Sequence, residues 1–374
     1  MKTLLILARH YPPAISGGAR RPFLLAAALR RLGVEVRVCA PSLPEGEPGW
    51  AVPHANRDPS TAPAQGGFNL RAVARDWLLW PDPDIRWCQR AANLVIADEW
   101  RPNWVLSTSP PESIHVAGRR LAEALGARWA ADLRDRWLEA PHRQERRRLH
   151  RRIGERSLAQ RLLPQADLVL AVDPVVASEA KALGGRTVHV LAHFTSSAPA
   201  QPHAFAPGTL NIVHAGSVAL SDPEARLEEL LTPFEAAQAA RPELRLHLVG
   251  RINARERGLI DASPAARAIT AHGPLPYEEA RSLMAGADAL AFVASGKMHV
   301  PPSKIADYLA FEAPILAFGD GPWRRDMRVP TGDPAAQLAG LHKGQGRNVE
   351  ARPDTDITAA RRFMDLVATC CNEA

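Results

Sequence analysis

The chain has 374 residues, which is the length of about two domains of ~150 residues each. Hydrophobic residues make up 46% and charged residues 23%, which excludes a disordered chain and allows sizeable cores. The net charge of +6 comes mostly from arginine. It suits an anionic partner such as a nucleotide diphosphate or a membrane surface, with arginine-rich composition bias as the alternative explanation.

The four cysteines, Cys39, Cys88, Cys370 and Cys371, form no C-x-x-C pair, and adjacent cysteines bridge only with strain. We therefore expect four reduced thiols in a cytosolic protein. The opening residues, MKTLLILARHYPP, contain too short an apolar run for a signal peptide and predict a buried first strand. No stretch of about 18 apolar residues predicts a membrane span.

In chain order, short apolar runs alternate with longer amphipathic segments, which is typical of parallel βαβ units with right-handed crossovers. Strands are expected at residues 4–8, 34–39, 104–107, 128–132, 168–172 and 187–191. Helices are expected at residues 22–32, 112–125 and 143–163, with a further helical segment around Trp77, Trp80 and Trp87. Residues 41–67 are rich in Pro, Gly, Ala and Ser and predict a mobile loop.

The alternation restarts after residues 196–208 (SSAPAQPHAFAPG), which have the composition of a linker. Strands are then expected at residues 210–214, 245–249, 268–271, 289–293 and 315–318, and helices at residues 224–240, 277–286, 304–311 and 356–371. We predict an α/β protein of two Rossmann-like domains that face each other across a cleft. The N-terminal domain would span residues 1–195 and the C-terminal domain residues 209–345. A tail, residues 346–374, would end in a helix that packs back on the first domain.

A glycine loop follows the first expected strand. Ser16, Gly17 and Gly18 lie between this strand and the first helix, where backbone N–H groups and the helix N-terminus can approach a phosphate. The loop is not G-x-G-x-x-G, and the second strand ends at Cys39 without the acidic residue of a dinucleotide-binding fold. This disfavours an NAD-dependent dehydrogenase. An ordinary strand-to-helix turn is the alternative interpretation.

The most specific motif is VPPSKIADYLAFEAPILA, which begins at Val300. Ser303 is a natural helix N-cap, and the free N–H groups of the first turn, together with Lys304, would form an anion site. Asp307 lies one turn further on the same face, where a carboxylate can hold a ribose diol. The alternative is a capped helix with a surface lysine and aspartate.

Turns after two other strands of the second half are weaker candidates. Gly216 and Ser217 follow the first of these strands, where a tight turn could face a donor. Arg251 follows the next strand and could pair with phosphate. Each position taken singly is better explained as a structural turn.

Three residues after the strand at 128–132 are candidates for catalysis. A carboxylate at a strand end, Asp132 or Asp135, can accept the proton of an acceptor hydroxyl. Arg134 can orient that carboxylate or bind an acceptor phosphate. The alternative is an Asp–Arg–Asp salt-bridge cluster that pins the strand end. Ser109 and His115 are candidates for acceptor contact, and a packed helix position is the alternative for His115.

These segments resemble family 4 retaining glycosyltransferases, which have the GT-B fold. YPPAISGGARRPFLLAAALRRLGVEVRVCAP is similar to the N-terminus of that family, and the motif at Val300 is similar to its P-S-K-x-x-E-Y-L-A-x-G-x-P donor site. TSPP with a downstream histidine, and DLRDRW from Asp132, are similar to segments of a bacterial subgroup that serves surface-polysaccharide assembly.

The resemblance implies a role for each matching position. The glycine loop would face the donor phosphates across the cleft, Ser303 and Lys304 would contact the diphosphate, and Asp307 would hold the ribose. The chain departs from the family pattern where Asp307 replaces a glutamate and where His299 replaces an earlier one. The donor-binding candidates are Gly17, Gly18, Gly216, Ser217, Arg251, Ser303, Lys304 and Asp307. The catalytic candidates are Asp135, Asp132 and Arg134.

A basic segment runs from Arg143 to Arg152 and continues as a helix with an intermittent apolar stripe. Such a helix can rest on anionic lipid, where each basic residue adds ~1 kcal/mol. A solvated helix face with internal Glu–Arg pairs is the alternative. Nucleic acid is not an expected partner, because no aromatic stacking platform or recognition motif accompanies the charge.

We therefore expect a cytoplasmic glycosyltransferase that moves a sugar from a nucleotide diphosphate sugar to a saccharide acceptor. A lipid-linked acceptor would place the protein at the inner membrane face. The resemblance implies retention of the anomeric configuration and no metal or other cofactor, with Lys304 stabilising the leaving diphosphate. The alternatives are a non-catalytic scaffold with the same fold, which the departures at Asp307 and His299 favour, and a nucleotide-sugar epimerase.

Overall fold

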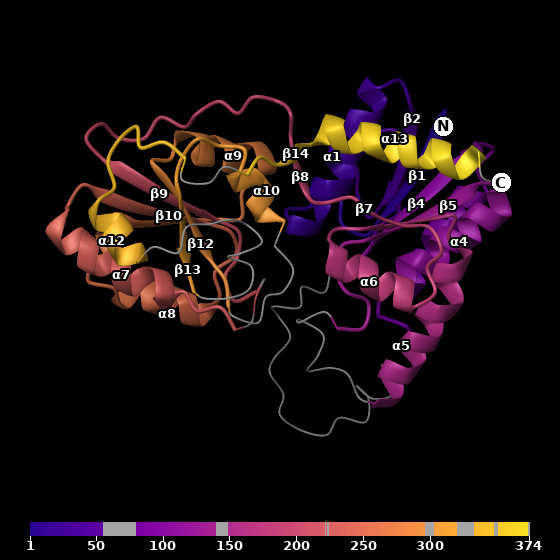
Figure 1. Cartoon of the computed structure of the whole chain (residues 1–374), viewed down its shortest axis with the longest axis horizontal. Coiled ribbons are helices and arrows are strands. Elements are labelled where there is room, and N and C mark those ends of the chain that lie inside the picture. Colours follow the sequence, from indigo (N-terminus) through magenta and orange to yellow (C-terminus); the bar gives the residue numbers. More distant parts are fainter. Residues whose placement is uncertain are drawn as a thin grey trace. The chain divides into compact units, whose positions relative to one another are not determined.

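The computed structural model describes residues 1–54, 80–139, 149–220, 222, 224–295, 303–319, 333–347 and 351–372. These residues form two compact α/β units (Figure 1). The first contains the chain up to Ala192 and the C-terminal helix, and the second runs from His193 to Thr355. Each unit is built around its own parallel sheet, which confirms the predicted fold class. The cleft expected between the units stays a prediction.

The sheet of the first unit has seven parallel strands in the order β3-β2-β1-β4-β5-β6-β7. They are β1 (Thr3–Ala8), β2 (Glu35–Ala40), β3 (Gly49–Ala51), β4 (Trp104–Ser109), β5 (Arg128–Leu133), β6 (Leu168–Ala171) and β7 (Val188–Val190). The central strands are almost wholly buried because helices cover both faces of the sheet. The strand order reverses between β1 and β4. In open α/β sheets, ligands bind beyond the carboxyl ends of the strands at such a reversal.

Helices on the two faces bury this sheet. They are α1 (Gly17–Arg31), α3 (Ile85–Ile96), α4 (Ser113–Leu125), α5 (Leu149–Leu162), α6 (Pro174–Ala182) and α13 (Asp356–Asn372). The C-terminal helix α13 packs against α1 (Figure 1), where Arg31 forms an ion pair with Asp356. Arg128 of β5 also donates a hydrogen bond of 2.5 Å to the carbonyl of Cys370. The prediction that the last helix packs on the first domain is therefore confirmed.

Helix α1 begins at Gly17, five residues before the expected start at Pro22. A proline inside a helix has no N–H group to bond the carbonyl four residues earlier, which here belongs to Gly18. The guanidinium of Arg134, which follows β5, donates to that carbonyl instead. The helix therefore continues through Pro22 because an arginine from another element supplies the missing donor.

The sheet of the second unit has five parallel strands in the order β11-β10-β9-β12-β13. They are β9 (Leu210–Ala215), β10 (Leu244–Val249), β11 (Ile269–Gly273), β12 (Ala289–Val293) and β13 (Ile315–Phe318). The helices are α7 (Glu228–Ala240), α8 (Ala254–Ala262), α9 (Tyr277–Gly286), α10 (Lys304–Tyr308) and α12 (Pro334–Ala339). Here the order reverses between β9 and β12. A two-stranded ladder joins β8 (Phe194–Thr195) to β14 (Asp354–Thr355).

Several elements differ from those expected. The segment predicted as a loop contains β3, which pairs with β2 through Cys39 and Trp50, while residues 55–79 lie outside the described residues. The short helices α6, α8 and α12 were not expected. All three carry clear start signals: Asp173 caps α6 and Asp333 caps α12, each ahead of a proline, and Asn253 opens a capping box in α8. The basic helix is described from Leu149 onward.

All four cysteines are free thiols, three of them buried and Cys371 exposed. Among the helices that the structure describes, none combines the length and apolarity that crossing a membrane requires.

Candidate functional site

The first candidate site lies at the carboxyl ends of β1, β4 and β5, beside the strand-order reversal. Arg134 connects the loops that follow these strands. Its Nε donates to the carbonyl of Ser109 at 2.5 Å, and its Nη1 donates to the carbonyl of Gly18. The structure thus brings together the glycine loop, the TSPP segment and the D-x-R-D segment. Because backbone carbonyls occupy two of its nitrogens, Arg134 acts here as a clamp between loops.

The two glycines of the loop differ in their surroundings. A Cβ atom added to Gly18 would lie 3.1 Å from Nη1 of Arg134 and 3.3 Å from Cβ of His10. An added Cβ at Gly17 would meet no atom within 4 Å. The close approach of Arg134 therefore explains why a glycine, with no Cβ atom, stands at position 18. Gly17 is exposed at the first turn of α1, where its space is open to a ligand.

Asp132 lies in a buried ion pair. Nη2 of Arg21 is 2.9 Å from Oδ1, Nε of Arg21 is 3.0 Å from Oδ2, and the hydroxyl of Thr108 donates to Oδ2 at 2.8 Å. Burial alone would raise the pKa of Asp132, but the charge and hydrogen bonds of Arg21 outweigh burial and lower it. The hydroxyl of Ser109 contacts the backbone carbonyl of Asp132 at 3.4 Å. These contacts favour a structural role for Asp132 and for Ser109, because both are turned into the protein.

Asp135 has different surroundings. Its side chain is half-buried just beyond β5, and within the described residues its carboxylate makes no hydrogen bond or ion pair. The charges of Arg134 and Asp173 act on it from the neighbouring strand ends. Of the three catalytic candidates, Asp135 is the one whose carboxylate is available to an acceptor hydroxyl.

His10 lies against the same loop and was given no role from the sequence. It stands two residues after the end of β1, is half-buried, and contributes the Cβ that crowds Gly18. Burial, together with the charges of Arg134 and Arg9, lowers the pKa of His10 to about 4, so the imidazole is neutral at pH 7. Its position at the end of the first strand was the available sequence signal.

His115 is a buried residue of α4. Its Nδ1 lies 2.9 Å from the hydroxyl of Ser107, which also accepts a hydrogen bond of 2.9 Å from Nε1 of Trp129. The imidazole stacks on Trp137 with ring centres 5.4 Å apart. Burial lowers the pKa of His115 to about 3. This packing favours the interpretation of His115 as a core residue over acceptor contact.

The second candidate site lies at the carboxyl ends of β9 and β10, in the second unit. Gly216 has a φ of +110°, and its N–H bonds the carbonyl of Val249 at 2.6 Å. A Cβ atom added to Gly250 would lie 2.7 Å from the carbonyl carbon of Gly216. The hydroxyl of Ser217 accepts a hydrogen bond of 3.1 Å from the N–H of Arg251, whose side chain is exposed. Both strand ends therefore require glycine, because the turns that follow β9 and β10 pack closely against each other.

Lys304 lies beside the turn at Gly216. Its Nζ lies 3.6 Å from the position that a Cβ on Gly216 would take, and 5.2 Å from the ring centre of Phe292. Burial lowers the pKa of Lys304 to about 8, although the charge of Asp222 opposes this shift. Among the described residues, the ammonium of Lys304 therefore has no close anionic partner, and it lies beside the backbone of Gly216. A phosphate oxygen bound there would restore its charge balance.

The side chains of Ser303 and Asp307, the other two residues of this motif, lie in surroundings that differ from those predicted. Ser303 occupies the predicted N-cap position of α10, but it has helical backbone angles and its side chain makes no capping hydrogen bond. Asp307 is buried, and its Oδ1 accepts hydrogen bonds from Thr195 at 2.9 Å and from Tyr277 at 2.8 Å. Asp307 thereby joins α10 to β8 and α9, which favours a structural role over ribose binding. His299 lies outside the described residues.

Asp82 and Asp84, which form a D-x-D segment before α3, make contacts within the first unit. Asp82 accepts the N–H of Ser113 at 2.8 Å and so caps α4, while Asp84 pairs with Arg9 at 2.7 Å. In the part of the chain that the structure describes, no three His, Cys, Asp or Glu side chains gather as a metal site. Independence of metals and cofactors stays a prediction.

A family comparison covers most of the first unit. Residues 16–193 match the family model of the glycosyl transferase 4-like domain. These residues form a glycosyl transferase 4-like domain. The match includes the glycine loop, the TSPP segment and the D-x-R-D segment, so the resemblance inferred from these motifs is confirmed at the level of the family. Membership of a surface-polysaccharide subgroup stays a prediction.

Solved structures extend the comparison over both units. A candidate UDP-N-acetylglucosamine 2-epimerase from Listeria monocytogenes aligns with 100% of this chain and 98% of its own, at 12% identity and a TM-score of 0.60. The S. aureus MnaA–UDP co-structure aligns with 100% and 97%, at 12% identity and a TM-score of 0.56. AviGT4, a glycosyltransferase involved in avilamycin A biosynthesis, aligns with 99% and 98%, at 12% identity and a TM-score of 0.55. These likenesses show the GT-B fold. No curated protein sequence matches the chain significantly.

Proposed function

We propose that the chain is a glycosyltransferase that moves a sugar from a nucleotide diphosphate sugar to a saccharide acceptor. The glycosyl transferase 4-like domain supports transfer chemistry, and the GT-B fold supports a sugar nucleotide as the donor. The observation that carries the donor assignment is the ammonium of Lys304 beside the glycine turn at Gly216. A fixed cation placed at a leaving diphosphate stabilises the charge that develops as the glycosidic bond breaks.

The acceptor half of the proposal places the acceptor hydroxyl at the end of β5. Asp135 accepts its proton, and Arg134 holds the glycine loop and the TSPP segment in place around it. Retention of configuration and independence of metal ions belong to the same proposal. Full activity after EDTA treatment would support metal independence, and activity that EDTA abolishes and Mg²⁺ restores would contradict it.

A contact with anionic membrane is a separate part of the proposal. On α5, Arg152, Arg156 and Arg161 are exposed, and Ile153 is 62% exposed. Such a helix can rest on anionic headgroups, which would suit a lipid-linked acceptor. Sedimentation with phosphatidylglycerol vesicles, and not with phosphatidylcholine vesicles, is the expected result.

The donor site is tested by nucleotide binding. We expect UDP, or another member of a panel of GDP, ADP and dTDP, to raise the melting temperature of the wild-type chain. In Lys304→Ala, binding should weaken by about tenfold or more, because a half-buried charge-assisted contact is lost. Lys343→Ala, which removes an exposed lysine of the same unit, serves as the matched control and should bind like wild type. Unchanged nucleotide affinity in Lys304→Ala would sink the assignment.

Product analysis separates the proposal from its two rivals. Sugar transfer or slow donor hydrolysis, lost in Lys304→Ala, supports a transferase. An altered sugar formed from donor alone, without acceptor, would instead establish an epimerase. Nucleotide binding with neither product would establish a non-catalytic relative.

A further inference from the structure

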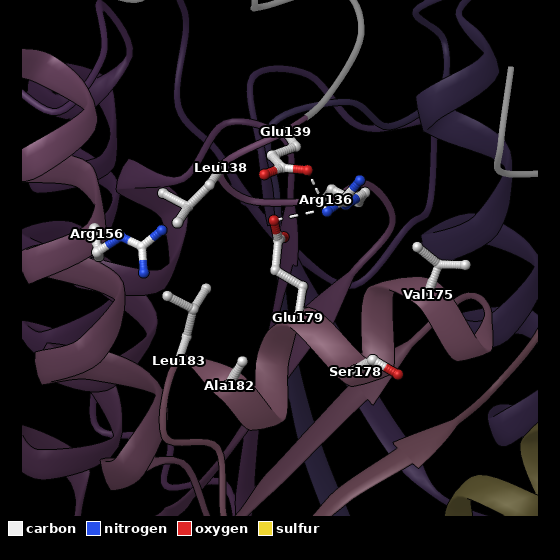
Figure 2. Close-up of a pocket in the computed structure, with 9 residues that line it drawn as sticks. All are labelled: Arg136, Leu138, Glu139, Arg156, Val175, Ser178, Glu179, Ala182 and Leu183. Atoms are coloured by element: carbon white, nitrogen blue, oxygen red, sulfur yellow. Dashed lines mark ion pairs between the residues drawn. The ribbon is translucent and has the colours of Figure 1, made fainter. Parts of the chain in front are cut away.

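A pocket of about 300 Å³ opens in the first unit, outside the two candidate sites at Arg134 and Lys304. This volume is at the small end of the ~300–1,000 Å³ range of ligand pockets and suits one monosaccharide-sized group. The loop after β5, the basic helix α5 and helix α6 form its walls (Figure 2). This loop also contains Arg134 and Asp135, so the pocket lies next to the proposed acceptor site along the chain.

One cation of the pocket is already neutralised. Arg136 is 2.5 Å from the carboxylate of Glu139 and 3.6 Å from that of Glu179, as the dashed lines in Figure 2 mark. Glu179 also accepts the N–H of Trp137 at 2.6 Å. This cluster fixes the loop to α6, and its two carboxylates and one guanidinium give that side of the pocket a net negative charge.

The second cation has no such partner. Arg156 is exposed on α5, and within the described residues its guanidinium makes no hydrogen bond or ion pair. Figure 2 shows the guanidinium turned toward the middle of the pocket, on the side of Leu138 and Leu183. The pocket therefore combines an uncompensated, bidentate donor with aliphatic walls.

We propose that this pocket binds an anionic sugar unit of the acceptor. The carboxylate or phosphate of that unit pairs with Arg156, and the C–H face of its ring packs on Leu138 and Leu183. That this sugar belongs to the acceptor rests on the proposed function, whereas the binding of an anionic sugar to the pocket does not. A neutral sugar would leave Arg156 without its anion and would bind more weakly.

Titration calorimetry with three probes tests this inference: methyl glucuronide, methyl glucoside 6-phosphate and neutral methyl glucoside. At least one anionic probe should bind about fivefold or more tightly than the neutral one, and the better probe tells whether carboxylate or phosphate is recognised. Arg156→Gln should remove this preference. Arg152→Gln makes the same charge change on the same helix at a residue that does not line the pocket, and it should keep the preference.

Two results would overturn the inference: equal affinity for anionic and neutral probes, or equal losses in Arg156→Gln and Arg152→Gln. The second result would show a general charge effect of α5. Circular dichroism and melting curves check that both variants fold, which is expected because both side chains are exposed. UDP binding measured on the same samples keeps a failure of this pocket distinct from a failure of the donor site at Lys304.

Discussion

Two aspartates that stand three residues apart have opposite surroundings. Asp132 is 2% exposed and paired with Arg21, whereas Asp135 is half-buried and, among the described residues, makes no hydrogen bond or ion pair. Both follow the same expected strand and both carry the same chemistry, so residue type alone could not rank them. The choice depends on Arg21, which is 111 residues away from Asp132 in the chain.

Substituting each aspartate should separate stability from activity. Asp132→Asn should lower the free energy of unfolding by about 3 kcal/mol or more, because it leaves the buried charge of Arg21 uncompensated. Asp135→Asn should lower kcat for transfer by about 100-fold or more with little change in stability, because a proton acceptor is lost at a half-exposed position. Urea unfolding and steady-state kinetics measure the two effects. The reverse pattern, with Asp135→Asn destabilising and Asp132→Asn folded but inactive, would reject these roles.

At the scale of elements, helix α1 depends on a donor from outside itself. The sequence predicted that the helix starts at Pro22, because an interior proline removes one hydrogen bond. The structure starts it at Gly17, since Arg134 supplies the hydrogen bond to the carbonyl of Gly18. The same hydrogen bond joins the glycine loop to the D-x-R-D segment, because its donor, Arg134, belongs to that segment. The two segments therefore belong to one site.

A double-mutant cycle tests this exchange. Arg134→Met should destabilise the first unit by about 1–3 kcal/mol, because it leaves the Gly18 carbonyl without its donor. Pro22→Ala should have a small effect in the wild type. In the Arg134→Met background it should restore part of the loss, since an alanine N–H can bond the same carbonyl.

Urea unfolding of the four proteins measures the coupling between these two positions. Strictly additive effects would show that the carbonyl of Gly18 is not what the two residues share.

At the scale of the whole molecule, each unit contains a fully buried neutral histidine. Burial lowers the pKa of His115 in the first unit to about 3, and burial with the charge of Lys304 lowers the pKa of His214 in the second unit to about 3. In an unfolded chain both would titrate near 6.5. Below that pH the unfolded chain binds protons that the folded chain does not, so stability falls as the pH falls from 6.5 toward 3.

Acid should therefore destabilise both units. Each of the two histidines lowers the free energy of unfolding by up to about 1.4 kcal/mol per pH unit below 6.5. Calorimetric melting between pH 7.5 and 5 should show the transitions of both units moving to lower temperature. His115→Gln should flatten this dependence for the first unit, while the exposed His342→Gln should leave it unchanged. Melting temperatures that rise with acid would contradict the assignment of buried neutral imidazoles.

The sequence by itself determined the architecture of both units and the chemistry of the candidate sites. Apolar runs, glycine turns and caps are encoded among near neighbours, so strands such as residues 289–293 and 315–318 and the helix at 277–286 were predicted with their observed bounds. The same local signals identified the glycine loop and Lys304. Short helices such as α6 were missed because their apolar stripe is brief, although Asp173 marked the start.

Only the tertiary structure decided which of these side chains are available for chemistry. Asp307 is hydrogen-bonded to Thr195 and Tyr277, His115 stacks on Trp137, and Asp132 is paired with Arg21. In contrast, Asp135 stays half-exposed and Lys304 lies beside the turn at Gly216. These partners are distant in the chain, and their pairing depends on strand order and register. Burial and pairing set whether a carboxylate, an imidazole or an ammonium can meet a substrate, and no local pattern encodes them.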